Sequence, residues 1–363
     1  MVPVVDLSRR GARLADVYAA RVAEVARRGA YLLGPETAAF ELELAAWAGI
    51  DSSAPMHAVT VASGASAIQL ALAGLGVGPG DEVIVPAFTA VPTASAVAAL
   101  GAVPVPVDVE AHTANLDPAL VATARTDRTR AVVVVHLYGR PATLPHTDLP
   151  IVEDAAQAHG AVADHARSAA VAYSFYPTKN LGGIGDGGAV VSRDSDLVER
   201  VRMLRVHGMT DLYVHEAVSQ NFRMSELEAA WLRLGLPLLD AANERRRQIV
   251  ARYHEAAPGV RWHARHERHV HHLCVARFER RDHVRELLGA AGVGTAVHYP
   301  LALTQQPAYR HLTRAACPEA EAWAASCVSL PCFPQLSDDE VEHVARALAD
   351  VADRVGLVTG ARA

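Results

Sequence analysis

The chain has 363 residues, of which 51% are hydrophobic and 20% charged, the composition of an ordered globular protein. This length predicts two domains of unequal size, and the net charge of −6 excludes the basic surface typical of nucleic-acid binding. No apolar run is long enough to span a bilayer, and the first residues lack a signal-peptide pattern. We therefore expect a cytoplasmic protein that binds neither nucleic acid nor membranes.

The first part of the chain alternates helices with a short strand. Helices are predicted at residues 12–29 and 36–47, and a strand at 58–61 runs through Ser63-Gly64-Ala65-Ser66 into a helix at 67–72. A strand, a small-residue turn and a helix start leave backbone N–H groups unpaired at the positive end of the helix dipole, which suits a phosphate. A serine N-cap explains the same pattern, so the turn alone supports both interpretations.

Short apolar strands continue through the middle of the chain. They are predicted at residues 83–86, 103–107, 131–136 and 151–154, with a helix at 92–100. Strands that are apolar on both faces and alternate with helices predict a mostly parallel sheet with both faces covered. Ligands of such sheets bind at the carboxyl ends of the strands. We therefore expect a site where five strand-end clusters meet: Ser63–Ser66, Pro86–Thr89, His136–Tyr138, Asp154–Gln157 and Ser174–Lys179.

The last third of the chain predicts a second unit. A long helical segment from Ser225 to about His254 follows two loop segments. A strand near 273–278, a helix at 282–291, a strand at 296–300 and a closing helix at 338–349 then form a compact α+β unit. We place the large domain, with an N-terminal arm, at 1–240 and the small C-terminal domain at 241–363.

Cysteines and histidines give no metal site. The four cysteines include no Cys-x-x-Cys pair, which indicates reduced thiols. Five histidines lie close together in the sequence without an acidic or cysteine partner at ligand spacing, so we interpret them as a polar surface. They are His263, His266, His269, His271 and His272.

Lys179 is the only lysine, since the 34 basic residues comprise this one and 33 arginines. A guanidinium stays protonated, whereas an amine can become a neutral nucleophile, so a lone lysine in an arginine-rich chain is a candidate for Schiff-base chemistry. It follows an apolar strand and precedes five glycines within nine residues, which let the backbone approach a ligand closely. The alternative, a surface lysine, needs no such turn.

Schiff-base lysines serve aldolases, decarboxylases and enzymes of pyridoxal phosphate (PLP). PLP needs an amine, a carboxylate against its pyridine nitrogen, a phosphate cradle and a flat group against its ring. Lys179 offers the amine and Asp154 the carboxylate, although a helix cap is the alternative role for Asp154. Gln157 lies one turn further on and can donate to the phenolic oxygen of PLP. Candidate phosphate contacts are Ser63, Gly64, Ala65, Ser66 and Ser174.

Five runs resemble the DegT/DnrJ/EryC1/StrS family of PLP-dependent sugar aminotransferases. They are GDEVIVP at 80–86, HLYG at 136–139, EDAAQAHG at 153–160, SFYPTKNLG at 174–182 and VHYP at 297–300. The resemblance implies the fold type I of PLP-dependent transferases, like aspartate aminotransferase. This fold has a large, mostly parallel seven-stranded sheet domain and a smaller α+β domain. It also implies a homodimer with shared active sites and PLP held as an internal aldimine by Lys179. By position, Asn221 matches the family asparagine that reaches the phosphate in the neighbouring subunit.

Two positions depart from the family pattern. The phosphate loop usually reads Ser-Gly-Thr-Asp/Ser-Ala, whereas residues 63–67 read SGASA, so the phosphate must rest on backbone N–H groups and Ser66. Many members place a ring-stacking aromatic where this chain has Ala90, and we expect Phe88 to cover the ring instead. Relatives that dehydrate carry histidine in place of the lysine, and Lys179 argues against that branch.

The resemblance implies an aminotransferase with ping-pong kinetics. L-glutamate is the expected amino donor, and a nucleotide-linked keto-deoxyhexose of aminosugar or antibiotic biosynthesis is the expected acceptor. Lys179 would move the proton between the donor's α-carbon and the cofactor. The alternatives are an enzyme acting on a cyclitol or related cyclic ketone, and a PLP-binding regulatory protein without turnover. Candidate substrate contacts, for which packing is an equal explanation, are His159, Arg223, His298 and Tyr299.

Overall fold

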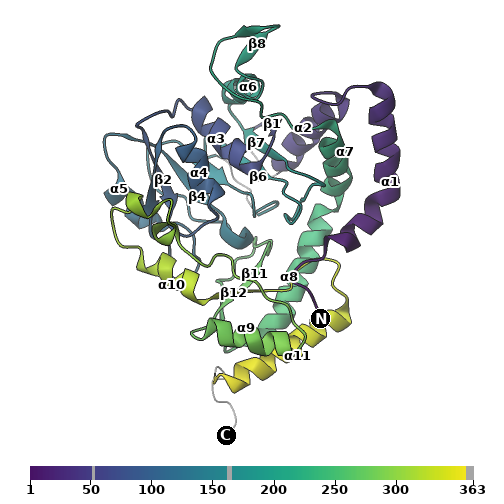
Figure 1. Ribbon diagram of the computed structural model, residues 1–363, viewed down its shortest axis with the longest axis vertical. Helices are drawn as coiled ribbons and strands as arrows, with labels where there is room; N and C mark the ends of the chain where they lie inside the picture. The colour runs from purple at the N-terminus through teal and green to yellow at the C-terminus, as the bar shows by residue number, and fades with distance from the viewer. Residues whose placement is uncertain (51–53, 162–165, 357–363) are drawn as a thin grey trace.

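The computed structural model describes residues 1–50, 54–161 and 166–356. A seven-stranded sheet in the order β1-β7-β6-β5-β4-β2-β3 forms the centre of its larger unit (Figure 1). Strands β2 to β6 pair in parallel, whereas β7 is antiparallel to both of its neighbours. The predicted mostly parallel sheet is therefore confirmed. The strands are β1 (His57–Val61), β2 (Glu82–Pro86), β3 (Val103–Val107), β4 (Thr129–Val135), β5 (Ile151–Asp154), β6 (Ala170–Ser174) and β7 (Gly188–Ser192).

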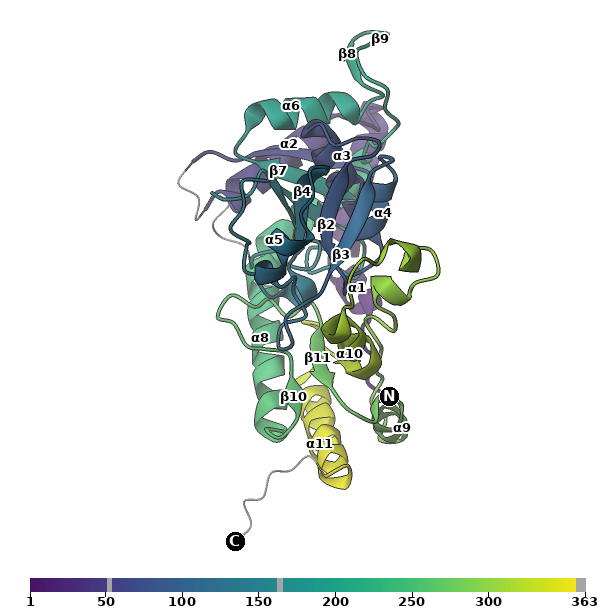
Figure 2. The same cartoon turned by 90° about the vertical axis from the view of Figure 1, so that its left-hand side faces the viewer.

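Helices cover both faces of this sheet because its strands are apolar on both sides (Figure 2). On β2, for example, Val83 and Val85 pack towards one face and Ile84 towards the other. The first face is covered by α3 (Gly64–Gly74), α4 (Pro92–Ala98) and α6 (Ser195–Leu204). The second is covered by α2 (Pro35–Ala48), α7 (Glu226–Gly235) and the short α5 (Val121–Ala124). Helix α1 (Leu7–Arg28) stands on the flank against α7.

The second unit has a three-stranded sheet, in the order β10-β11-β12, packed on three helices. Its strands are β10 (Arg261–Trp262), β11 (Cys274–Arg277) and β12 (Cys327–Leu330), and its helices are α8 (Leu239–Ala256), α9 (Arg281–Ala290) and α11 (Asp338–Arg354). Helix α8 joins the two units (Figure 1), and the boundary predicted at residue 240 falls in its first turn. The start of the chain also crosses over, since Val2 pairs with Val293 and lies in the core of this unit.

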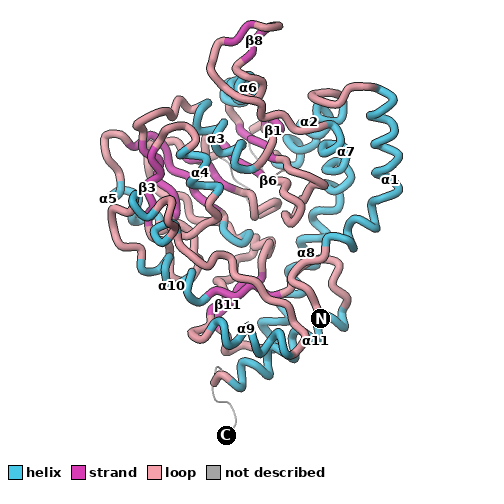
Figure 3. Tube along the Cα trace, in the orientation of Figure 1, coloured by secondary structure: helices cyan, strands magenta, loops and turns pink. Residues whose placement is uncertain are grey.

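Several predicted elements differ from the structure (Figure 3). The strand predicted at 296–300 is wrong, because Ala296 makes only an isolated bridge to Ser329 of β12. The single helix predicted from Ser225 is broken by the 3-10 turn Leu236–Leu238, which contains Pro237. Elements absent from the prediction are α5, α6, α10 (Pro318–Ser326), β10, β12 and the hairpin of β8 (Met209–Asp211) and β9 (Val214–His215). The remaining 3-10 turns are Pro118–Leu120, Leu137–Gly139, Leu303–Gln305 and Arg310–Leu312.

The histidine cluster is not the polar surface we predicted. His263, His269 and His272 are buried. His263 Nε2 donates to the carbonyl of Thr113 at 2.7 Å, so its Nδ1 accepts from His269 Nε2 at 3.2 Å. His269 Nδ1 in turn accepts from the N–H of His271 at 2.9 Å. Both ring nitrogens of His263 and both of His269 therefore have a hydrogen-bond partner while the two rings are neutral. Across the described residues, no group of three or more His, Cys, Asp or Glu is arranged to hold a metal ion.

Acidification is expected to destabilise the fold through these rings. Burial lowers the pKa of His263 to about 4, against 6.5 in the unfolded chain. The unfolded state therefore binds the proton first, so the stabilisation is complete above pH 6.5 and is lost as pH falls towards 4. His263 alone should lower the free energy of unfolding by about 1.4 kcal/mol per pH unit in this window. Urea unfolding at about pH 7.5 and about pH 5 measures the loss.

Two variants separate this cluster from general acid denaturation. His263→Gln removes one buried titrating ring and should make the free energy of unfolding less dependent on pH. His146→Gln removes an exposed ring and should leave the dependence unchanged. Equal pH dependence in the unsubstituted protein and in His263→Gln would contradict the prediction.

Candidate active site

A cavity of about 280 Å³ lies where the strands of the large sheet end, against the start of α3. We call it the cofactor cavity. Among the described residues, no helix is both long and apolar enough to cross a membrane. The structure brings seven predicted site residues to its wall: Ser63, Gly64, Ala65, Asp154, Gln157, Ser174 and Lys179.

The start of α3 forms one end of the cofactor cavity. Ser63 caps the helix, its Oγ accepting from the N–H of Ser66 at 3.1 Å. The N–H groups of Gly64 and Ala65 come first in the helix and have no acceptor inside it. A Cβ on Gly64 would lie 2.5 Å from the Cβ of Ser174, so glycine lets α3 approach β6 this closely. These N–H groups and the helix dipole can hold a phosphate.

Ser66 does not reach the cavity wall. Its hydroxyl lies 2.9 Å from that of Ser63 instead, so it hydrogen-bonds the capping residue of α3 and does not face the cavity. Ser174, at the end of β6, lines the wall and its Oγ accepts from the N–H of Tyr176 at 3.3 Å. The phosphate contacts available are therefore the first N–H groups of α3 and the hydroxyls of Ser63 and Ser174.

Asp154 forms the other end of the cofactor cavity, at the end of β5. Its Oδ2 accepts from the hydroxyl of Thr93 at 2.9 Å and its Oδ1 from the N–H of Ala156 at 3.1 Å. It is buried, yet no cationic side chain of the described residues lies within ion-pair distance. A buried carboxylate with only neutral donors suits a positively charged ring nitrogen. Thr93, which α4 places here, was not predicted as a site residue, whereas its partner Thr89, at 3.1 Å, belongs to the predicted strand-end cluster Pro86–Thr89.

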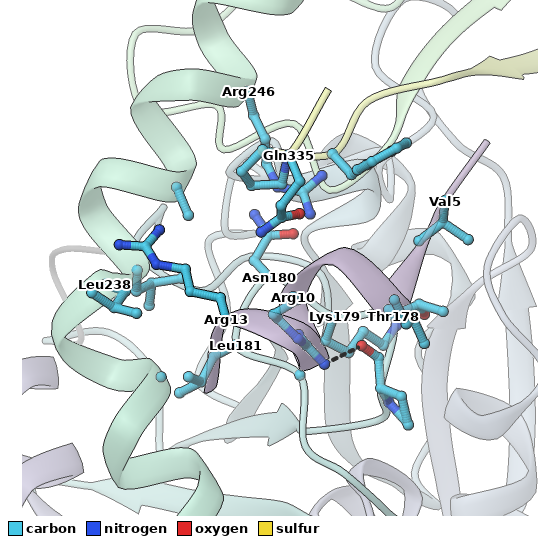
Figure 4. Close-up of a pocket in the computed structure, with 18 of the residues that line it drawn as sticks. Val5, Arg10, Arg13, Thr178, Lys179, Asn180, Leu181, Leu238, Arg246 and Gln335 are labelled. Carbon is cyan, nitrogen blue, oxygen red and sulfur yellow. Dashed lines mark hydrogen bonds between the residues drawn. The ribbon is translucent and has the colours of Figure 1, made fainter. Parts of the chain in front are cut away.

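Lys179 lies in the connection between β6 and β7. Burial lowers its pKa to about 8, an effect opposed by the attraction of Asp154. An amine with this pKa is more often neutral, and therefore nucleophilic, than a solvated lysine. The loop is held in place from outside, because Arg10 Nη2 donates to the carbonyls of Pro177 at 3.0 Å and Gly183 at 3.1 Å (Figure 4).

His298 and Tyr299 meet Lys179 in a second cavity, of about 440 Å³. Gln157 connects the two cavities, since its Nε2 donates to the hydroxyl of Tyr299 at 3.0 Å and its Oε1 accepts from the N–H of Tyr138 at 2.7 Å. Burial raises the pKa of Tyr299 to about 12, so its hydroxyl stays protonated. His298 Nδ1 lies 2.9 Å from the hydroxyl of Ser329, which orients the ring.

Four predicted site residues lie elsewhere in the chain. Phe88 does not cover the cofactor cavity, because β2 ends at Pro86 and the ring packs against Trp323 and Tyr299. His159 is fully buried against Tyr173, and desolvation followed by Lys179 lowers its pKa to about 3. Neither residue lines the cavities beside Lys179. Asn221 is exposed and Arg223 partly so, with Arg223 Nε donating to Asn221 Oδ1 at 2.9 Å.

The cofactor cavity fits PLP by the chemistry of its two ends. Anion-binding N–H groups lie at one end and an unpaired buried carboxylate at the other, with a desolvated amine on the same wall. Phosphate, pyridine nitrogen and aldehyde each find the group they need. Among the described residues of this chain, Phe88 does not supply the predicted flat group against the ring, and Ser66 and Asn221 do not line the cavity.

Comparisons with known proteins agree with this geometry. The DegT/DnrJ/EryC1/StrS aminotransferase family matches residues 13–349. A dTDP-3-amino-3,4,6-trideoxy-alpha-D-glucose transaminase of Streptomyces venezuelae is 44% identical over 372 residues, covering 98% of this chain and 97% of its own. The crystal structure of S. venezuelae DesV in complex with a ketimine intermediate has a TM-score of 0.89 at 43% identity, covering 97% of this chain and 99% of that one.

A more distant structure includes a cofactor. NtdA from Bacillus subtilis with bound cofactor PMP has a TM-score of 0.88 at 26% identity, covering 97% of this chain and 85% of that one. The shared fold confirms the expected architecture of a type I PLP-dependent transferase. Because both the family match and the 44% identity extend over nearly the whole sequence, the chain belongs to the DegT/DnrJ/EryC1/StrS aminotransferase family.

Proposed function

We propose that this aminotransferase moves an amino group from L-glutamate to a nucleotide-linked keto sugar, with PLP held by Lys179. The observation that carries the proposal is the position of Lys179, a desolvated amine on the wall of a cavity that ends in Asp154 and in the start of α3. The 44% identical relative is named for a dTDP-linked amino sugar, which supports a nucleotide-linked acceptor here.

Each residue of the cofactor cavity has a defined task in this proposal. PLP, when bound, supplies an electron sink for the carbanion chemistry of transamination. Asp154 keeps the ring nitrogen protonated, while Ser63, Ser174 and the first N–H groups of α3 hold the phosphate. Lys179 moves the proton at the donor's α-carbon, and its pKa of about 8 suits both halves of that task.

The two half-reactions test the proposal separately. L-glutamate added without sugar should convert the aldehyde form of the cofactor to its amine form, seen by absorbance. A dTDP-linked keto sugar should then restore the aldehyde form. Turnover with a free cyclitol ketone in place of the nucleotide sugar would favour the cyclic-ketone alternative. No conversion by any amino acid would overturn the proposal and leave a PLP-binding protein without turnover.

We propose further that the enzyme is a homodimer with shared active sites. The β8–β9 hairpin projects from the body of the subunit (Figures 1 and 2). It is strongly exposed and apolar, with Tyr213 84% and Leu212 72% accessible. A two-stranded hairpin is marginally stable alone, and exposed apolar groups indicate a contact surface. Asn221 follows this hairpin and lines none of the three cavities beside Lys179, which supports a role at the partner's phosphate.

Mixed dimers test the assignment of Asn221. Lys179→Ala and Asn221→Ala should each be impaired alone when cofactor is scarce. In their mixed dimer one site combines an intact Lys179 with an intact Asn221 from the other chain. Random mixing should therefore restore about one quarter of the unsubstituted activity. Absence of any restoration would contradict a shared site.

All four cysteines are free and buried, which supports the proposed cytoplasmic location.

A further inference from the structure

Outside the cofactor cavity, Lys179 adjoins two cavities whose linings contain arginine and almost no carboxylate. The second cavity is lined by Lys179, Arg246, His272 and His298, and its lining contains no Asp or Glu. A third cavity, of about 380 Å³, adjoins it through Lys179 and Arg246 (Figure 4). Its only acidic residue is Asp6, which is already engaged in capping α1 and pairing with Arg9. An anionic ligand is the chemistry that such a surface selects.

Arg246 is the central cation of this surface. It is only 6% exposed, and no carboxylate of the described chain lies within ion-pair distance of it. Its Nη1 donates to three carbonyls, those of His271, His272 and Cys332. Its Nε has no hydrogen-bond partner, and none of these three hydrogen bonds uses Nη2. Burial of a guanidinium without a counter-ion costs free energy, and a bound anion reduces that cost.

The free edge of Arg246 has the geometry of a carboxylate site. Nε and Nη2 form one side of the planar guanidinium, and two parallel N–H donors on one side match the two oxygens of a carboxylate. The carbonyl contacts of Nη1 fix the orientation of this edge. Figure 4 shows Arg246 reaching from α8 towards Gln335 and Asn180, into the third cavity. Both cavities that it lines also contact Lys179.

We propose that Arg246 binds the distal carboxylate of a dicarboxylic amino donor, an inference that rests on the proposed function. His272 lies between Arg246 and the lysine loop, since its Nδ1 is 3.2 Å from Asn180 Oδ1 and its carbonyl accepts from Arg246. Arg246 is therefore separated from the lysine loop by His272. This position suits the far end of a donor rather than its α-carboxylate. The residue thus determines the choice of donor.

The half-reaction with amino acid alone tests this assignment. L-glutamate and L-glutamine have nearly the same shape and differ in the distal charge. In the unsubstituted enzyme, kcat/KM for glutamate should exceed that for glutamine by about 10- to 100-fold, the value of a charged hydrogen-bonded pair. Arg246→Gln should bring the ratio close to one while the glutamine rate is retained. Arg246→Lys, which keeps the charge without the fork, should give an intermediate ratio.

Arg247→Gln is the matched control. Arg247 is the next residue on α8 and also donates to a carbonyl of the same loop, that of His269 at 3.2 Å, but it lines neither cavity beside Lys179. Its ratio of glutamate to glutamine should stay that of the unsubstituted enzyme. If Arg246→Gln lowered kcat/KM for glutamate and for glutamine by similar factors, the proposal would be overturned. Arg246 would then only hold α8 against the neighbouring loops.

Two further measurements separate the possible anions, and the first of them needs no variant. Glutarate should inhibit the unsubstituted enzyme at a concentration at least about tenfold lower than its monoamide does, and equal inhibition would overturn the proposal. Binding of dTDP should be the same in Arg246→Gln as in the unsubstituted enzyme. Weaker dTDP binding with an unchanged donor ratio would overturn it in favour of a diphosphate site. If no amino acid reacts with the unsubstituted enzyme, the proposed function and this inference both fail.

Discussion

Replacement of Lys179 by alanine is expected to remove transamination and to leave the chain without any lysine for a borohydride-stable adduct. The loss should be at least about 10³-fold, since the residue would serve both as the covalent attachment and as the acid–base group. Intact mass after borohydride reduction in the presence of PLP gives the covalent readout. The unsubstituted protein should gain one reduced pyridoxyl phosphate, and Lys179→Ala should gain none.

The single lysine makes this measurement sharp, because a lysine adduct on this chain has one possible position. Lys179→Arg serves as the matched control, since it keeps the positive charge near Asp154 and removes the nucleophilic amine. It should bind PLP without forming the adduct. An adduct that persists in Lys179→Ala would contradict the assignment and place the chemistry elsewhere.

The site was predictable where it depends on the ends of parallel strands. Asp154, Ser174 and Ser63 each follow or end an apolar strand, and the parallel arrangement of β4, β5 and β6 brings such ends to one edge. Lys179 was found from composition, because an amine cannot be replaced by guanidinium. These signals are local in the sequence, so they can be recognised without the structure.

The residues that were missed depend on contacts between distant elements. Arg246 joins the site only because α8 packs beside the lysine loop, 67 residues from Lys179 (246 − 179). The pattern of charges on α8 gave no sign of this contact. Phe88 was expected to cover the ring in place of Ala90, but β2 ends at Pro86 and the Phe88 ring packs against Trp323 and Tyr299. Burial of the histidines likewise depends on Thr113, which belongs to the other unit.

The small unit shows the same limit for secondary structure. Its second strand was predicted at 296–300, yet β11 pairs with Cys327–Leu330 instead. Both segments are short and apolar, so local pattern does not choose between them. The choice is made by pairing with β11 and by packing on α9 and α11. Long amphipathic helices such as α11 were predicted well because their periodicity extends over several turns.

Asp154→Asn is expected to impair the half-reaction with glutamate by about 10²- to 10³-fold, the usual cost of removing one preorganised electrostatic group. The amide keeps the shape of the side chain and can still accept from the Thr93 hydroxyl, but it no longer holds the ring nitrogen protonated. Stopped-flow absorbance of the cofactor measures the rate. A rate within a few-fold of the unsubstituted enzyme would contradict the role assigned to Asp154.

The same substitution should change Lys179 before any cofactor is present. Asp154 attracts the ammonium and so raises the pKa of Lys179 against the larger effect of burial, which brings it to about 8. Removal of that charge favours the neutral amine, so the pKa of Lys179 should fall further. An amine-reactive reagent should label Lys179 at a rate that depends on pH, and intact mass measures that rate. The midpoint of this pH dependence should therefore lie at lower pH in Asp154→Asn.

Thr93→Val is the control for this shift, because it removes the 2.9 Å hydrogen bond to Asp154 and leaves the carboxylate in place. Its labelling midpoint should stay close to that of the unsubstituted protein. An unchanged midpoint in Asp154→Asn would mean that the carboxylate does not act on the lysine across the cavity. Asp154 and Lys179 would then be electrostatically independent, and the half-reaction alone would test the pairing of Asp154 with the ring nitrogen.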